Sequence, residues 1–258
     1  MYNANFFGDF DVAAFLTVAF TLFFVGLVAY LRREDRREGY PLEDDVTGRL
    51  EPSAGLFWAA APKTFILRDG HGTLTVPTGE RDPFEVNARR TARAAGSPLE
   101  PVGDPLLAGV GPGSYAQRAK RPDILIHGQT KIAPLRVSPG FSIDRKDVSP
   151  IGMKVVGADG ETAGVVSDAW IDRAEYMIRY LEVALTGSSR KVLVPMPMAV
   201  IHKGKKTVEV AAVLAAQFAN APTLENPDQI TFDEEERVAA YFGGGLLYAT
   251  PDRTEPYL

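Results

Sequence analysis

Residues 12–31 read VAAFLTVAFTLFFVGLVAYL, and this stretch decides the class of the fold. It holds no charged side chain, and its only polar groups are the hydroxyls of Thr17, Thr21 and Tyr30. A helix of about 20 residues spans about 30 Å, the thickness of a bilayer's hydrocarbon core. A helix in a soluble core is usually shorter and keeps a polar face. We therefore predict a transmembrane helix over residues 12–31.

The charges on either side of this stretch predict its orientation. Asp9 and Asp11 precede it without any Lys or Arg, whereas residues 32–37 contain four arginines. A cleaved signal peptide carries its positive charge in front of the apolar run, so the sequence favours a retained anchor. The positive-inside rule places residues 1–11 in the periplasm and the rest of the chain in the cytoplasm, with the arginines near anionic headgroups.

One face of the predicted helix carries Ala13, Thr17 and Thr21 at four-residue spacing. Small residues in this pattern allow another helix to approach closely. Alternatively, the threonine hydroxyls donate back to their own helix and the face touches lipid. The pattern leaves both interpretations open.

Composition excludes several classes of function. The 258 residues carry a formal net charge of −5, which does not indicate a nucleic-acid-binding protein. The absence of cysteine excludes disulfides, thiolate metal sites and cysteine nucleophiles. The three histidines lie far apart in the sequence, so no local metal site is expected.

Residues 32–130 are expected to lie extended near the membrane surface. Residues 32–62 indicate a linker, and residues 63–67 and 73–76 flank a glycine-containing turn, which predicts a short hairpin. Residues 77–122 are rich in Pro, Gly, Ala and Arg and contain too little apolar material to fold alone. We expect this last segment to be ordered by a partner.

Residues 131–258 have a different pattern, in which short apolar runs alternate with turn residues. Regularly spaced short strands joined by hairpin turns predict a small antiparallel β-barrel. The predicted strands are residues 154–156, 164–171, 178–185, 191–194 and 207–213. Near the end, residues 233–242 begin with acidic side chains and precede Gly243, Gly244 and Gly245, which predicts a helix with a glycine stop.

No catalytic motif is present. The glycine-rich run at residues 109–113 lacks the G-x-G-x-x-G spacing and a preceding strand, and neither a Walker A motif nor a G-x-S-x-G elbow occurs. We therefore expect a protein that is not an enzyme.

Two polar groups remain as candidate sites. Asp172, Glu175 and Arg179 lie within eight residues of one another beside apolar strands. They are typical either of a solvated salt bridge or of a relay in which neighbouring carboxylates pass protons. Asp123 and His127 form the second group, which indicates either an ordinary surface loop or a place where protons are collected.

In order along the chain, a series of short segments resembles the H subunit of purple-bacterial photosynthetic reaction centres. The resemblance covers nearly the whole chain, and its specificity comes from the succession of the segments. They are YLRREDRREGYPLE, PKTFIL, HGTLTVP, GDPLLAGVGPGSY, KIAPLRV, DAWID, RYLEV, QFA and EEERVAAYFGGGLLYATP.

The resemblance implies a single-span subunit of the bacterial inner membrane, in its intracytoplasmic or chromatophore form. It also implies a PRC-barrel over residues 131–258. Such subunits cap the L and M subunits on the cytoplasmic side, shield the secondary quinone and supply part of its proton path. Bacteriochlorophyll, bacteriopheophytin, quinones and non-haem iron are then expected on L and M, with none of them bound by this chain. A cytochrome subunit and a light-harvesting antenna are further expected partners, as is membrane lipid.

Within the family pattern, Asp172, Glu175 and Arg179 match positions associated with the proton path near the secondary quinone. The family's surface proton-uptake motif has an Asp and two His just before a Lys-Ile pair. Here only His127 matches that motif, and Asp123 lies two residues off register.

Two other interpretations compete with the resemblance. A barrel tethered by one helix could be a membrane adaptor or an assembly factor. Copurification with bacteriochlorophyll absorbance would distinguish a reaction-centre subunit from either of these. A membrane-anchored hydrolase would need a nucleophile and a base, and the sequence shows no such constellation.

Overall fold

The computed structural model describes residues 11–50, 60–68, 71–81 and 86–254. The chain divides into two compact units. The N-terminal unit comprises residues 1–83 and 93–96, and the C-terminal unit comprises residues 84–92 and 97–258. The predicted periplasmic residues 1–10 lie outside the described part.

The predicted membrane helix is present as α1 (Val12–Glu34), followed by the short helix η1 (Asp35–Arg37). Asp11 caps its N-terminus by accepting from the backbone N–H groups of Ala13 and Ala14. The apolar helix has a mean hydropathy of 2.5 and none of that stretch is buried within the chain, which fits a single-pass membrane protein.

The threonine hydroxyls on α1 bond to their own helix. Thr17 Oγ1 donates to the carbonyl of Ala13 at 2.8 Å, and Thr21 Oγ1 donates to the carbonyl of Thr17 at 2.7 Å. These bonds satisfy both hydroxyls in an apolar surrounding without a partner helix.

The predicted hairpin is confirmed as β1 (Lys63–Ile66) paired antiparallel with β2 (Thr73–Val76). Of its turn, Asp69 and Gly70 lie outside the described residues. Arg37 ties the base of the hairpin to the end of α1, because its guanidinium donates to Glu34 and to the carbonyls of Ala61 and Val76.

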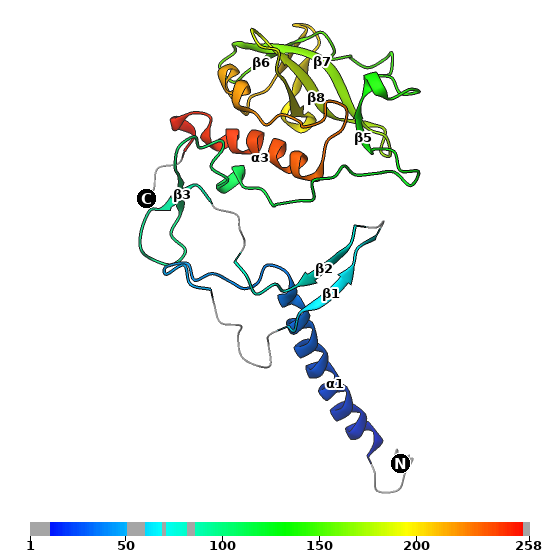
Figure 1. Ribbon diagram of the computed structural model, residues 1–258, viewed down its shortest axis with the longest axis vertical. Helices are drawn as coiled ribbons and strands as arrows, with labels where there is room; N and C mark the ends of the chain where they lie inside the picture. Colours follow the sequence, from blue (N-terminus) through cyan, green and yellow to red (C-terminus); the bar gives the residue numbers. More distant parts are fainter. Residues whose placement is uncertain (1–10, 51–59, 69–70, 82–85, 255–258) are drawn as a thin grey trace, which may run out of the picture. The chain divides into compact units, whose positions relative to one another are not determined.

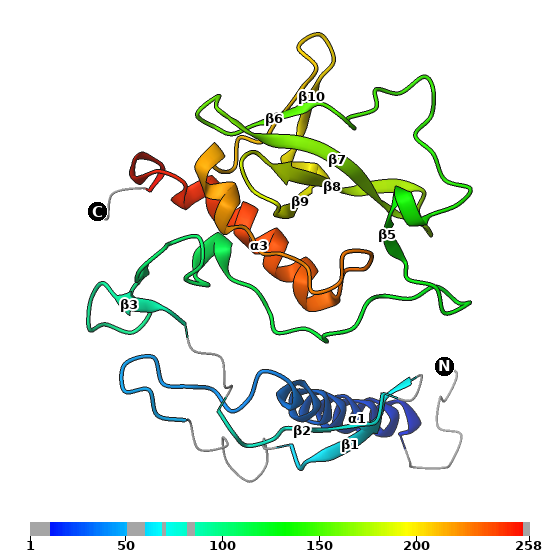
Figure 2. The same cartoon turned by 45° about the horizontal axis from the view of Figure 1, so that its top comes forward.

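The C-terminal unit is built on a seven-stranded curled sheet (Figure 1, Figure 2). Its order is β10-β11-β6-β7-β8-β9, and β5 pairs with β7 outside this path. All pairs are antiparallel except β11 with β6, which is parallel. The strands are β5 (Ile132–Pro134), β6 (Lys154–Val156), β7 (Thr162–Asp172), β8 (Met177–Leu185), β9 (Lys191–Pro195), β10 (Val200–His202) and β11 (Thr207–Glu209).

Shorter elements connect and flank this sheet. A separate pair, β3 (Ala88–Arg90) with β4 (Leu99–Pro101), lies earlier in the chain. The 3-10 turns are η3 (Gly111–Gly113), η4 (Leu135–Val137), η5 (Met196–Met198), η6 (Ala215–Asn220) and η7 (Pro251–Arg253). The five predicted strands of the C-terminal unit are therefore present, although the last ends at Glu209 and not at residue 213. The strands β3, β4, β5 and β10 were not predicted.

An apolar core fills the interior of the curled sheet. Consecutive residues of β7, β8 and β9 are buried, so both faces of these strands are covered, because successive side chains of a strand point to opposite faces. The C-terminal helix α3 (Phe232–Tyr248) lies along one side of the sheet (Figure 2). The largest fully buried side chains include Trp170, Leu181, Phe218, Tyr241 and Phe242.

One buried carboxylate in this core is fully compensated. Glu182 on β8 accepts from Lys191 Nζ and Arg136 Nη1 at 2.8 Å each, and from Ser167 Oγ at 2.7 Å. Trp170 Nε1 donates to it at 3.2 Å. Burial alone would raise the pKa of Glu182, but these hydrogen bonds outweigh it and lower the pKa to about 2.

The predicted glycine stop after residue 242 is wrong, because α3 continues through all three glycines to Tyr248. The glycines serve close packing instead. A Cβ on Gly245 would lie 2.4 Å from the carbonyl oxygen of Ala212, and one on Gly244 would lie 3.1 Å from Gly113 Cα. The glycine-rich run at residues 109–113 thus packs against the glycines of α3.

Candidate functional site

Strand pairing brings the two ends of the candidate site together. Ile132 of β5 lies opposite Asp172 at the end of β7, so the preceding residue, Lys131, reaches Asp172. A tight turn folds Asp123 back on Lys131, whose backbone N–H donates to the carbonyl of Asp123 at 2.8 Å. Glu175 follows in the turn between β7 and β8.

The ammonium group of Lys131 stands at the centre of three carboxylates. Its Nζ lies 3.5 Å from Asp172 Oδ2, 3.7 Å from Asp123 Oδ2 and 3.7 Å from Glu175 Oε1. Burial alone would lower the pKa of Lys131, but the three carboxylates outweigh it and raise the pKa. Lys131 therefore remains charged, and it screens the repulsion among the acids. We call these four residues the Lys131 cluster.

The three carboxylates differ in their access to water. The side chain of Glu175 is 53 % exposed, that of Asp123 is 36 % exposed and that of Asp172 is fully buried. Asp172 Oδ1 accepts from the backbone N–H groups of Ala174 and Glu175. Its Oδ2 is buried without a hydrogen-bond partner among the described residues. One oxygen of the buried acid is thus held by backbone N–H groups, and the other faces the Lys131 ammonium as an ion-pair partner.

The sequence interpretation named Arg179 as the cation for Asp172 and Glu175, but within the described residues it forms no ion pair with either of them; Lys131 does. Arg179 lies on β8 next to Tyr180, and its charge acts on Glu235 of α3. Tyr180 Oη donates to Glu235 Oε2 at 2.9 Å. Burial raises the pKa of Glu235 above its usual range, while the Tyr180 hydrogen bond and Arg179 oppose that rise.

Glu235 and the Lys131 cluster are electrostatically linked. Asp123 raises the pKa of Glu235, and Lys131 lowers it. Burial also raises the pKa of Tyr180, and the neighbouring Glu235 raises it further. Tyr180 therefore keeps its proton at neutral pH and serves as a hydrogen-bond donor.

His127 occupies the exposed tip of the turn that begins at Asp123. In the part of the chain that the structure describes, no hydrogen bond or ion pair joins its imidazole to Asp123, which instead faces Lys131. Asp123 and His127 thus belong to one turn, in which the carboxylate faces Lys131 and His127 is exposed to solvent.

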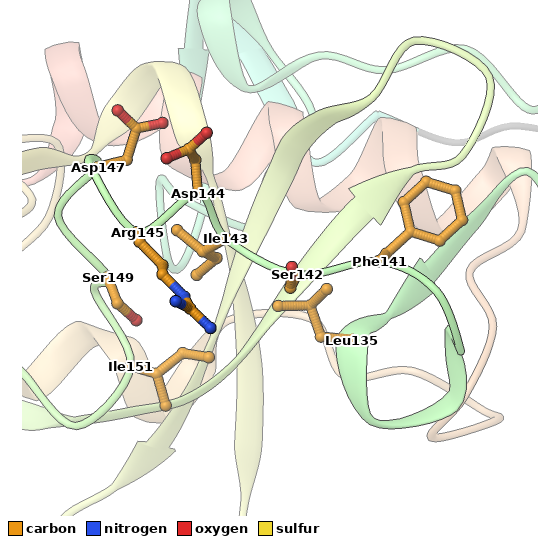
Figure 3. Close-up of a pocket in the computed structure, with 9 residues that line it drawn as sticks. All are labelled: Leu135, Phe141, Ser142, Ile143, Asp144, Arg145, Asp147, Ser149 and Ile151. Carbon is orange, nitrogen blue, oxygen red and sulfur yellow. The ribbon is translucent and has the colours of Figure 1, made fainter.

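The C-terminal unit also has a hollow of about 450 Å³ beside the loop that follows η4 (Figure 3). Leu135, Ile143 and Ile151 supply apolar walls, and the Arg145 side chain extends towards Ile151. None of its lining atoms is among the buried unpartnered polar atoms of the described residues. Within those same residues, no group of acids and histidines could hold a metal ion.

Sequence reasoning missed Lys131, Tyr180 and Glu235. The available signal for Lys131 was its position directly before an apolar run, which is weak because most lysines are solvated. Glu235 was noticed only as one of the acids that favour a helix N-terminus. Its contact with Tyr180 joins a helix to a strand that is distant in sequence, and no local pattern announces such a pair.

Two family models match the chain. Residues 4–137 match the photosynthetic reaction centre H-chain N-terminal region. Residues 144–217 match the PRC-barrel domain, which corresponds to the curled sheet from β6 to β11 and the start of η6.

Proposed function

Because the chain belongs to the photosynthetic reaction centre H-chain family, we propose that it caps the L and M subunits and conducts protons to their secondary quinone. As a reaction-centre H subunit it associates with the reaction-centre core. The finer proposal concerns what its own side chains do there. Reduction of a quinone to quinol takes up two protons, and a quinone shielded from bulk water needs side chains that carry them.

The observation that carries this proposal is the graded exposure of the Lys131 cluster. Glu175 and Asp123 reach water, whereas Asp172 is fully buried, and all three lie within 3.7 Å of the same ammonium. Carboxylates held this close can exchange protons. A proton taken from water by Glu175 or Asp123 can therefore pass to buried Asp172, whose Oδ2 faces the same ammonium at 3.5 Å.

Lys131 and Arg179 have supporting roles in this proposal. Both are cations near neutral pH, so neither releases a proton readily. Lys131 holds the three acids together, and Arg179 lowers the pKa of Glu235. His127, at the exposed tip of its turn, is proposed as a residue that collects protons for Asp123.

The remaining expectations for the complex are part of the same proposal. We propose that α1 crosses the membrane with its N-terminus in the periplasm, because the arginines follow the apolar run. Bacteriochlorophyll, bacteriopheophytin, quinones and non-haem iron would be held by L and M. A cytochrome subunit and an antenna are further proposed neighbours.

Glu175→Gln tests the proton-conducting role, because glutamine keeps the size and hydrogen bonding of the side chain but cannot ionise. The substitution should slow proton uptake and the proton-coupled second electron transfer to the secondary quinone. It should leave the first charge separation unchanged, because the pigments are proposed to lie on other chains. Flash-induced absorbance kinetics on assembled complexes would measure both steps.

Glu161→Gln is the matched control, since Glu161 is an exposed acid in the turn between β6 and β7. It should leave both steps unchanged. Unaltered second electron transfer in Glu175→Gln across neutral pH would reduce the Lys131 cluster to a structural ion pair.

A further inference from the structure

The two faces of the β1–β2 hairpin differ in chemistry. The strand register places Lys63 opposite Val76 and Phe65 opposite Leu74, so these four side chains share one face. The other face carries Thr64 opposite Thr75, whose hydroxyls are 2.8 Å apart, and Ile66 opposite Thr73. Phe65 and Leu74 are partly exposed. The hairpin therefore presents an apolar face that the described residues of its own unit leave partly open.

This face adjoins the end of the membrane helix. Phe65 and Val76 line a hollow of about 250 Å³ together with Glu34, Asp35, Arg37 and Glu38. Two contacts fix the arrangement: Arg37 donates to the carbonyl of Val76, and Lys63 Nζ lies 4.0 Å from Glu34 Oε2. Figure 1 shows the hairpin beginning beside the end of α1.

The position of Glu34 gives the depth of the hairpin base. At about 1.5 Å per residue, Glu34 lies roughly 5 Å beyond residue 31, the last of the uncharged run. The headgroup layer is about 5–8 Å deep on each side of the hydrocarbon core. Lys63 and the apolar face thus start within that layer. Arg32 and Arg33 in the last turn of α1 suit the phosphates found at the same depth.

We propose that the apolar face of the β1–β2 hairpin, with the hollow beside it, is a lipid-contact surface lying in the headgroup layer. Phospholipid is the occupant because Lys63 and Val76 of this face contact the end of a helix that fits a membrane span, through Glu34 and Arg37. An amphipathic element at this depth buries its apolar side at the headgroup–acyl boundary. Lys63 matches that location: its ammonium lies over the Phe65 ring, 5.1 Å from the centroid, so its stem covers apolar surface while its charge stays near Glu34.

The test compares two adjacent residues of β2 that face opposite ways. The chain has no cysteine, so Leu74→Cys and Thr75→Cys each place one small fluorophore on it. The complete complex is reconstituted in vesicles of phosphatidylcholine and phosphatidylglycerol that contain a lipid with a nitroxide near its headgroup. Labelling of other subunits is subtracted with a complex that has no introduced cysteine. Phe65→Cys with Thr64→Cys repeats the comparison on β1.

We expect nitroxide lipid to quench the label at residue 74 several-fold more strongly than the label at residue 75. Equal or weaker quenching at residue 74 overturns the proposal. If that label is also protected from aqueous iodide, a core subunit covers the face instead. The readout does not involve electron transfer, so it is independent of the proposed proton-conducting role.

Discussion

Replacing Glu182 by glutamine should destabilise the C-terminal unit, and the loss should depend on pH. The carboxylate of Glu182 is 4 % exposed and is held by Lys191 and Arg136. Glutamine fills the same volume but removes the negative charge, which leaves the guanidinium of Arg136 with Asp168 and Asp228 as its remaining ion-pair partners among the described residues.

The magnitude follows from the pKa. Folding lowers the pKa of Glu182 from 4.5 to about 2, a change of about 2.5 units. At about 1.4 kcal/mol per unit, the ionised carboxylate contributes about 3 kcal/mol to the free energy of unfolding. This agrees with the cost of about 3–5 kcal/mol for removing one member of a buried ion pair.

The sign of the pH dependence is also determined. Because the pKa is lower in the folded state, the stabilisation is fully present above pH 4.5 and is lost as the pH falls towards 2. Wild type and Glu182→Gln should therefore differ by about 3 kcal/mol at pH 7, and this difference should shrink steadily below pH 4.5.

Trp170 provides the assay, because it is fully buried and its Nε1 donates to Glu182. The chain has two tryptophans, so Trp58→Phe leaves Trp170 as the single reporter. Urea unfolding of the full chain in detergent would be followed by its fluorescence at several pH values, with Glu161→Gln as the control. Equal stability of wild type and Glu182→Gln at pH 7, or a difference that stays constant down to pH 3, would refute the reasoning.

Three further predictions follow from the site, the packing and the orientation. Lys131→Met should lower the free energy of unfolding by about 3 kcal/mol in the same urea assay, because buried Asp172 loses its ion-pair partner; unchanged stability would contradict this. Gly164→Ala should cost about 2 kcal/mol or more, since its Cβ would lie 2.2 Å from the carbonyl oxygen of Ala184. Gly204→Ala, with nothing within 4 Å of its Cβ, should be nearly neutral, and equal costs would contradict the packing argument. Protease added to sealed, cytoplasm-side-out vesicles should digest the chain beyond α1, and protection of that part would reverse the proposed orientation.

The sequence alone was sufficient for elements whose cause is local. The membrane helix follows from an unbroken run of apolar side chains, and Asp11 begins it by capping its first N–H groups. The β1–β2 hairpin and five strands of the C-terminal unit follow from short apolar runs that are bounded by turn residues. In each case the deciding interactions lie within a few residues along the chain.

The same local reasoning gave a wrong end for α3. A glycine run favours a helix stop when nothing else competes. In the folded chain, Gly244 and Gly245 allow α3 to approach Gly113 and the carbonyl of Ala212 more closely than any side chain would permit. The packing across these contacts outweighs the helix-breaking tendency of glycine. A local sequence pattern does not show which distant segment will contact the helix.

The candidate site divides along the same line. Asp172 and Glu175 could be selected from the sequence because they are close in the chain beside apolar strands and because they match the family pattern. Their cation is Lys131, which comes from a distant segment, because β5 pairs with β7 in a register that sets Ile132 opposite Asp172. Local preferences for dihedral angles and solvent determine which elements form, whereas the pairing of distant strands, driven by burial of their shared core, determines which charges meet.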